Sequence, residues 1–128
     1  FLITLCYEKL FERFPNLRIA SVENGAEFLP DLFRKLRQSR DRMRSYYKED
    51  PAELFRQHVW INPFWEDDVN EVAHHMGVDR VIFGSDWPHI EGLPTPLDYV
   101  VELEKFNDQE KQLILRDNTR FLNTPRPL

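Results

Sequence analysis

The sequence predicts an α/β fold in which helices connect the strands of a parallel sheet. Helical and strand-like patterns alternate along the chain in the order α, β, α, β, α, β, α. Each strand-like run is short and apolar, as buried parallel strands are, and polar residues follow it. Parallel strands need crossover connections, which are usually helical. We therefore expect one domain with three parallel strands.

The first half of the chain supplies two helices and one strand. Apolar residues recur at helical spacing over residues 1–14, and Pro15 and Asn16 end that pattern. A run with β-branched residues predicts a strand from Leu17 to Val22. Apolar residues at helical spacing then predict a second helix from Phe28 to about Arg44.

The middle of the chain repeats this order. Asp50 and Pro51 mark a turn, and residues 58–62 read as a strand that Pro63 ends. Three acidic residues, 66–68, precede the next apolar pattern, where the helix dipole favours negative charge. Gly77 suits the C′ position of this helix. The third strand is expected from Val81 to Gly84.

The last part of the chain reads as helical. Thr95, Pro96 and Asp98 form a helix start of cap, proline and acid, for a helix that runs to about Phe106. We expect Asp108 to cap a short helix through Leu115. Residues 118–123 close the chain, and the proline-rich tail 124–128 is expected to be loose.

Composition limits the class of protein. The 128 residues are 41% hydrophobic and 30% charged, which is typical of a soluble globular domain. The net charge of −5 disfavours nucleic-acid binding, and no apolar run is long enough to cross a membrane. The single cysteine, Cys6, permits a reducing cytoplasm and fits a buried thiol. The chain begins with Phe1 inside a helical pattern, so we expect a fragment of a longer protein.

Polar or aromatic side chains follow all three predicted strands. They are Glu23 and Asn24 after the first, Asn62, Phe64 and Trp65 after the second, and Asp86, Trp87 and His89 after the third. The carboxyl ends of parallel strands share one edge, where ligands bind in α/β folds. These groups therefore predict one pocket, in which Asp86 is placed to act as a carboxylate ligand or base. A turn-forming role for Asp86 and a salt bridge for Glu23 are the simpler alternatives.

Other polar residues favour structural roles. His58 begins its predicted strand at the opposite edge, and His74 and His75 lie late in a helix. Seven basic residues between Arg34 and Lys48 fit a solvated helix face better than a binding surface for RNA or phosphate. The sequence contains no phosphate-binding glycine loop, nucleophile elbow, HExxH or CxxC motif.

The stretch VIFGSDWPH, Val81 to His89, resembles the final barrel strand of the amidohydrolase-related metal-dependent hydrolases. The similar branch includes aminocarboxymuconate-semialdehyde decarboxylase and the γ-resorcylate-type decarboxylases. Weaker similarities come in the family's order: FPNLRI at 14–19, ENGA at 23–26 with FLP at 28–30, and the closing segment 114–122 with DNTR at 117–120.

This resemblance implies that residues 1–128 are the C-terminal part of a (β/α)8 TIM barrel, with strands six to eight and their flanking helices. It implies a divalent metal, zinc with manganese as an alternative, for which Asp86 is the strand-eight ligand. The family's other ligands would lie upstream of this chain. Many members have a histidine at the end of strand six, where this chain has Glu23, and that departure puts the decarboxylase identity in doubt.

The sequence thus favours an enzyme, a metal-dependent hydrolase or non-oxidative decarboxylase for a small carboxylated or aromatic substrate. Asp86 and Glu23 are the candidate catalytic residues, and Trp87, His89, Trp65 and Asn24 the candidate substrate-binding residues. We expect a homo-oligomer without nucleic-acid or membrane partners. The alternatives are a catalytically inactive fragment or oligomerising piece without the N-terminal ligands, and a binding module built on residues 34–48.

Overall fold

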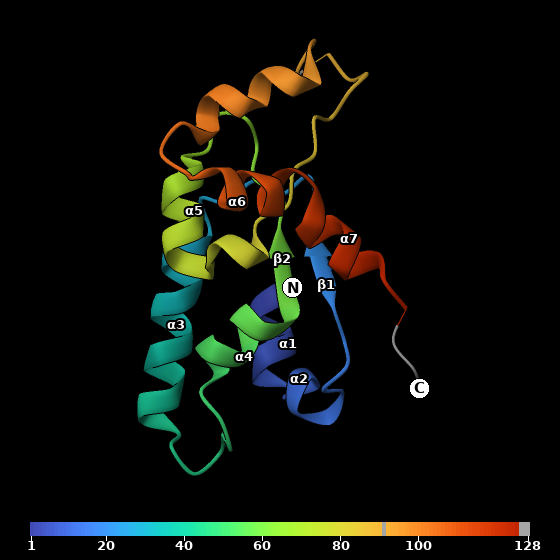
Figure 1. The fold of residues 1–128 in the computed structure, drawn as a ribbon. Helices are drawn as coiled ribbons and strands as arrows, with labels where there is room; N and C mark the ends of the chain where they lie inside the picture. Colours follow the sequence, from blue (N-terminus) through green and yellow to red (C-terminus); the bar gives the residue numbers. More distant parts are fainter. Residues whose placement is uncertain (91, 126–128) are drawn as a thin grey trace.

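Two short parallel strands lie at the centre of the molecule, and helices surround them (Figure 1). The computed structural model describes residues 1–90 and 92–125. Strand β1 (Ile19–Ser21) pairs with β2 (Val59–Ile61) in the register Ile19 to Val59, Ala20 to Trp60 and Ser21 to Ile61. The parallel pairing of the first two predicted strands is therefore confirmed.

The third predicted strand, Val81 to Gly84, is reduced to a single bridge. Val81 pairs in parallel with Ile61, and the Ile82 N–H donates to the Ile61 carbonyl at 2.9 Å. Over the described residues the sheet itself has two strands, so the prediction of three full strands was wrong. After Ile82 the backbone forms its next hydrogen bonds with helical and loop segments, through Phe83 to Ile114 and through Ser85 to Leu93.

Four helices come from the first half of the chain. They are α1 (Leu2–Tyr7), α2 (Leu10–Arg13), α3 (Leu29–Arg42) and α4 (Pro51–His58). The predicted helix over 1–14 is broken because Lys9 takes a left-handed conformation, with φ of 55°. This turn redirects α2 so that Phe11 is buried and stacks on the His58 ring, with centroids 4.6 Å apart. Phe14, expected on the inner face, is half exposed.

Helix α4 was missed by the sequence prediction, which placed only a turn at Asp50 and Pro51. The Asp50 side chain caps this helix by accepting a hydrogen bond from the Ala52 N–H at 2.9 Å. Pro51 occupies the first helical turn, where its missing N–H costs nothing. His58 is consequently the last residue of a helix, not the start of a strand, and its Nδ1 lies 2.7 Å from the Leu17 carbonyl oxygen.

The second half contributes α5 (Val69–Met76), the 3-10 turn η1 (Val78–Arg80), the 3-10 helix η2 (Pro96–Leu103), α6 (Asp108–Gln112), the π-helical turn η3 (Leu113–Asp117) and α7 (Asn118–Asn123). Asp68, one of the three acids predicted at the start of α5, caps this helix through its side chain, and Gly77, predicted at its end, ends it with positive φ. Asn107, not Asp108, caps α6, because its side chain forms a capping box with Glu110. Thr95 makes no side-chain cap bond at η2.

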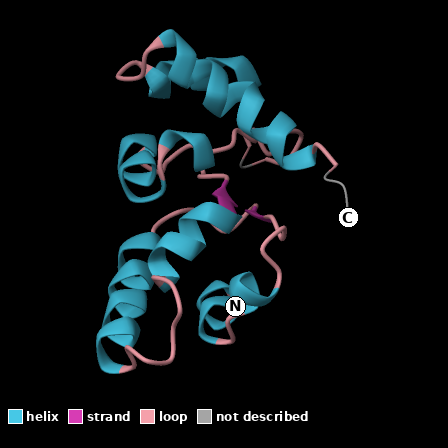
Figure 2. Ribbon diagram, turned by 60° about the horizontal axis from the view of Figure 1, so that its bottom comes forward, coloured by secondary structure: helices cyan, strands magenta, loops and turns pink. Residues whose placement is uncertain are grey.

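One apolar core joins the two halves. Helices α3 and α4 meet through Phe33 and Phe55, whose rings pack edge to face with centroids 5.6 Å apart. Both are fully buried, as are Val59 and Ile61 of the central strand. Figure 2 shows the strands between two groups of helices. Within the described part of the chain, no helix combines the length and apolar character needed to cross a membrane. The predicted tail reaches residues 126–128, which lie outside the described residues.

Candidate metal site at the strand ends

The C-terminal ends of the two strands and of the Val81 segment face the same side of the molecule, at the top of Figure 1. Glu23 and Asn24 follow β1, Asn62 to Trp65 follow β2, and Ser85 and Asp86 follow the Val81 segment. The Asn62 N–H donates to the Ser21 carbonyl at 2.9 Å, so the pairing continues to the edge at which these loops begin.

Three potential ligands for a metal ion gather at this edge. Ligand atoms of Glu23, Asp86 and His89 all lie within 4.8 Å of one another. The Nδ1 atom of His89 is 3.1 Å from Oδ1 of Asp86. Asp86 is partly buried, whereas Glu23 and His89 are exposed. The sequence singled out all three residues but predicted a metal role for Asp86 alone.

The backbone adopts the same unusual conformation at both carboxylates. Glu23 has φ of 57° and Asp86 has φ of 56°, in the left-handed region that residues other than glycine seldom occupy. Such a conformation costs about 1–3 kcal/mol, and strained residues of this kind concentrate at functional sites. The sharp turn after each strand is where the two carboxylates converge.

Backbone hydrogen bonds within the loop of residues 85–93 hold Asp86 in place. The carbonyl of Asp86 accepts from the His89 N–H at 2.9 Å, and the carbonyl of Ser85 accepts from the Leu93 N–H at 2.9 Å. Gly92 packs directly on this loop, since a Cβ there would lie 2.6 Å from the Asp86 carbonyl oxygen. The sequence analysis did not identify Gly92, and a lone glycine in a loop gives little signal for such a contact.

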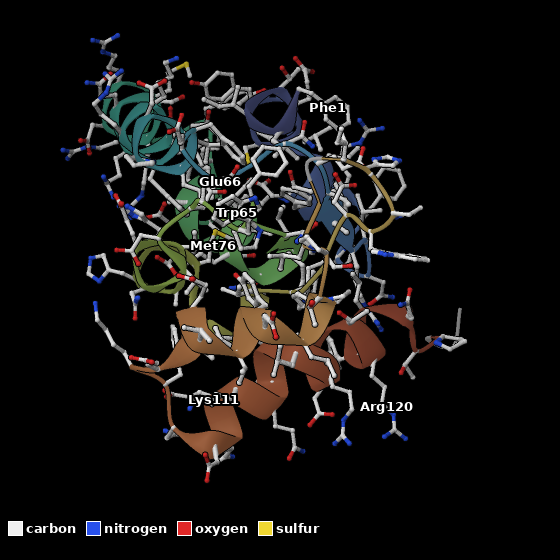
Figure 3. The ribbon with its side chains drawn as sticks, turned by 90° about the horizontal axis from the view of Figure 1, so that it is seen from above. Phe1, Trp65, Glu66, Met76, Lys111 and Arg120 are labelled. Atoms are coloured by element: carbon white, nitrogen blue, oxygen red, sulfur yellow. The ribbon has the colours of Figure 1, made fainter. Side chains whose placement is uncertain are left out.

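A cavity of about 570 Å³ opens beside the cluster. Its lining includes Glu23, Asn24, Trp65 and Asp86 from the predicted site. Further carboxylates line it, namely Glu27, Glu66 and Asp67. Figure 3 looks down on this face and shows Trp65 and Glu66 near the middle of the view, with Phe1 in the upper part and Arg120 in the lower part. Among the described lining residues there is no lysine or arginine.

Aromatic side chains form part of the cavity wall. Phe64 and Trp65 are 45% and 48% exposed, which leaves half of each surface available to a ligand. Asp67 holds the Phe64 backbone, because its Oδ2 accepts the Phe64 N–H at 2.7 Å. Gly25, with φ of 57°, leaves room for the Phe64 ring, since a Cβ there would lie 2.8 Å from Cδ2 of Phe64.

The remaining predicted binding residues occupy different places. Asn24 lines the cavity while its Nδ2 donates to the Val22 carbonyl at 2.9 Å. Trp87 is 66% exposed and lies outside the lining. His89 is also outside the lining, but its Nδ1 lies 3.1 Å from Oδ1 of Asp86, which does line the cavity.

The residues for which the sequence favoured structural roles are not part of the cluster of Glu23, Asp86 and His89. His58 is buried at the end of α4, and His75 lies 3.7 Å from Glu71 on its own helix. The basic helix α3 carries ion pairs, including Lys35 to Asp31 at 2.6 Å. Burial raises the pKa of the Cys6 thiol to about 12, so this thiol is no candidate nucleophile.

The donor set suits a hard or borderline divalent cation. Two carboxylates and one imidazole match the ligand types of zinc and manganese sites. The residues of this chain therefore fit such an ion.

Comparison with known proteins relates this arrangement to a family. The model of the Amidohydrolase family matches residues 3–122. The search of curated proteins finds no match. Among solved structures, the chain is similar to the crystal structure of an amidohydrolase from Mycobacterium avium subsp. paratuberculosis K-10, with 40% sequence identity and a TM-score of 0.92. The match covers 94% of this chain and 32% of that one, so the chain spans about a third of that relative.

Proposed function

The chain belongs to the amidohydrolase family, and on this basis we propose that it forms strands six to eight, with their helices, of a (β/α)8 barrel. The parallel pairing of β1 with β2 and the bridge to Val81 support this architecture. Among the described residues β1 pairs with β2 alone, which leaves its other edge open to a preceding strand. Residues 1–128 are then one partial barrel domain. Barrels of this kind contain about 250 residues, and their active sites lie at the C-terminal strand ends.

We propose that the barrel acts as a metal-dependent hydrolase or a non-oxidative decarboxylase. The observation that carries this proposal is the convergence of Glu23, Asp86 and His89 within 4.8 Å at the strand ends. A divalent ion held there, zinc or alternatively manganese, would lower the pKa of a bound water and polarise a substrate carbonyl or carboxylate.

The residues of this chain take distinct roles in the proposal. Asp86 would bind the ion and would accept a proton from the attacking water. Glu23 is the second carboxylate of the cluster and moves a proton at the leaving group or product. His89 holds Asp86 through the contact of 3.1 Å. Glu23 stands where many relatives of the decarboxylase branch have a histidine, so hydrolysis and decarboxylation both remain within the proposal.

The side chains that line the cavity indicate the class of substrate. Trp65 and Phe64 offer half-exposed aromatic surface for a small aromatic substrate, and Asn24 offers polar contacts. The described lining carries carboxylates and no lysine or arginine. A carboxylated substrate would therefore need the ion itself as its counter-charge at this end of the pocket.

We further propose a cytoplasmic homo-oligomer without nucleic-acid or membrane partners. A single cysteine suits a reducing compartment, and the net charge is −5. The alternative is a catalytically inactive fragment or oligomerising piece without the N-terminal metal ligands. The exposed edge of β1 supports it, because unpaired strand edges invite association.

Metal titration of two variants tests the proposed function. Asp86→Ala removes a ligand, so the affinity for Zn²⁺ measured by calorimetry should fall at least about tenfold while the circular dichroism spectrum is retained. Asp98→Ala, an exposed acid on η2, is the matched control and should bind Zn²⁺ like the wild type. Unchanged affinity in Asp86→Ala would contradict the role of this carboxylate.

Glu23 is tested by measurement of turnover rather than of Zn²⁺ affinity. Glu23→Gln keeps the size of the side chain and removes its charge, so turnover should fall by about 10²-fold or more if Glu23 transfers protons. Glu23→His should retain or raise decarboxylation if the chain descends from that branch. Full turnover in Glu23→Gln would exclude the proton-transfer role.

A further inference from the structure

The Val81 to Phe83 segment, which leads to Asp86, has one edge on the sheet and one edge away from it. The Ile82 N–H donates to β2 through the Ile61 carbonyl at 2.9 Å. Successive residues of a strand direct their backbone groups to opposite sides. The carbonyl of Val81 and the N–H of Phe83 therefore face away from β2, where a strand at the end of a sheet would leave them unpaired.

The closing helical stretch pairs both of these groups. Nδ2 of Asn118 donates to the Val81 carbonyl at 2.7 Å and to the Val78 carbonyl at 2.8 Å. The Phe83 N–H donates to the Ile114 carbonyl at 3.1 Å. Asn118 and Ile114 are 3% and 0% exposed, so water does not compete with these bonds. One side chain and one helix carbonyl thus take the place of a neighbouring strand.

The π-helical turn η3 makes this contact possible. A π turn is wider than an α turn and disturbs the regular bonding of carbonyls within the helix. Ile114 lies in η3, and Asn118 begins α7 immediately after it. Such turns are rare and often accompany functional sites. Here the turn directs a helix carbonyl and an amide side chain at the same short backbone segment.

We infer that Asn118 is a positioning residue, which fixes the Val81 to Phe83 segment so that Asp86 meets Glu23. This inference rests on the proposed function of the cluster. The segment has one bridge to the sheet, whereas β1 and β2 share a ladder of three residue pairs. Asp86 follows Phe83 by three residues, so a shift of the segment moves this carboxylate relative to Glu23.

The two residues between Phe83 and Asp86 are held by contacts of their own, so a shift of Phe83 also moves Asp86. Gly84 is packed against Asn62, since a Cβ there would lie 2.9 Å from Oδ1 of Asn62. Ser85 is fixed by the bond from the Leu93 N–H at 2.9 Å. The backbone between the Asn118 contact and Asp86 therefore has little conformational freedom.

The test compares three variants of the protein with Zn²⁺ alone as the ligand. Asn118→Leu keeps the approximate volume and removes both hydrogen bonds. We expect it to weaken Zn²⁺ binding about tenfold, the effect typical of groups that hold a metal ligand in place. Asn123→Leu is the exposed control on the same helix. Leu36→Ala removes core volume far from the segment and should lower the Tm without changing the Zn²⁺ affinity.

Amide hydrogen exchange followed by NMR separates this inference from the proposed function. Asn118→Leu should accelerate exchange at Ile82 and Phe83 and leave the amides of β1 and β2 as slow as in the wild type. If the wild type binds no Zn²⁺, the proposed function fails while the exchange result still decides the role of Asn118. If Asn118→Leu does not fold, Asn118→Ser supplies the same two measurements. A folded variant with unchanged Zn²⁺ affinity and unchanged exchange overturns the inference.

Discussion

The two carboxylates of the candidate site follow backbone segments that are held in different ways. Glu23 follows β1, which pairs with β2 over three successive residues. Asp86 follows the Val81 to Phe83 segment, which has one bridge to the sheet and takes its remaining bonds from Asn118 and Ile114. We call these the ladder region, residues 19–23 and 59–61, and the clamped region, residues 78–86.

The difference has a physical consequence for the site. A backbone ladder tolerates most changes of side chain, because main-chain groups form its bonds. A segment fixed by one amide side chain depends on that residue. The geometry of the cluster should therefore be more sensitive to substitutions around the clamped region, while the stability of the fold should depend more on the core beneath the ladder region.

The largest loss of stability is expected from Phe55→Ala, which opens a cavity beneath the ladder region. Phe55 is fully buried in α4 and packs against Phe33. Truncation of such a ring costs about 3–5 kcal/mol. Urea unfolding measures this change, and Phe14→Ala, at a half-exposed ring, should cost less than about 1 kcal/mol. Equal losses in the two variants would contradict the proposed location of the core.

Gly92→Ala tests the clamped region at its C-terminal end. A Cβ at this position would lie 2.6 Å from the Asp86 carbonyl oxygen, so the backbone that carries this carboxylate must move. We expect Zn²⁺ affinity to fall about tenfold. Asp98→Ala, at an exposed position on η2, is the control. It should cost less than about 1 kcal/mol of stability and leave the Zn²⁺ titration unchanged.

Tyr99→Phe should stabilise the protein by about 1 kcal/mol, because it removes a buried hydroxyl that has no hydrogen-bond partner among the described residues. Tyr99 lies on η2 and packs on Phe83 of the clamped region, with ring centroids 5.0 Å apart. Thermal unfolding at neutral pH checks this expectation, and a lower Tm in the variant would indicate that the hydroxyl is paired.

The same tyrosine gives a pH dependence with a definite sign. Burial raises the pKa of Tyr99 from 10.0 to about 12 in the folded protein. Between these values the unfolded chain releases the phenolic proton and the folded chain retains it, so the free energy of unfolding falls as the pH rises through this range. Comparison of the wild type and Tyr99→Phe at about pH 8 and about pH 11 should show a smaller loss in the variant.

The smallest expected effect concerns Asp68, which caps α5. Hydrogen bonds from the Asn70 side chain and backbone, both at 2.9 Å, lower the pKa of Asp68. Its contribution to stability is therefore present above the ordinary pKa of an aspartate and is lost as the pH falls through the lowered value. Asp68→Asn keeps the acceptor without the charge. Its Tm should depend less on pH than that of the wild type between about pH 6 and about pH 3.

Local sequence signals were sufficient for much of the fold. The apolar spacing of α3, the acidic start of α5 and its end at Gly77 were predicted because they depend on neighbours within a few residues. The acids Glu23, after β1, and Asp86, after the Val81 segment, were found for the same reason, since a polar residue after an apolar run is visible in the sequence. Helix α4 carried a readable signal in Asp50 and Pro51, which the turn prediction underused.

Long-range contacts decided the rest. The break at Lys9 allows Phe11 to reach His58, a residue from the far side of the core. At its outer edge the Val81 segment bonds to Asn118 and Ile114, more than thirty positions later, in place of a neighbouring strand. The sequence by itself determined the parallel α/β order, the pocket edge and the choice of Glu23 and Asp86. Only the tertiary structure added His89 to the two carboxylates, because that meeting depends on how one loop folds back over another.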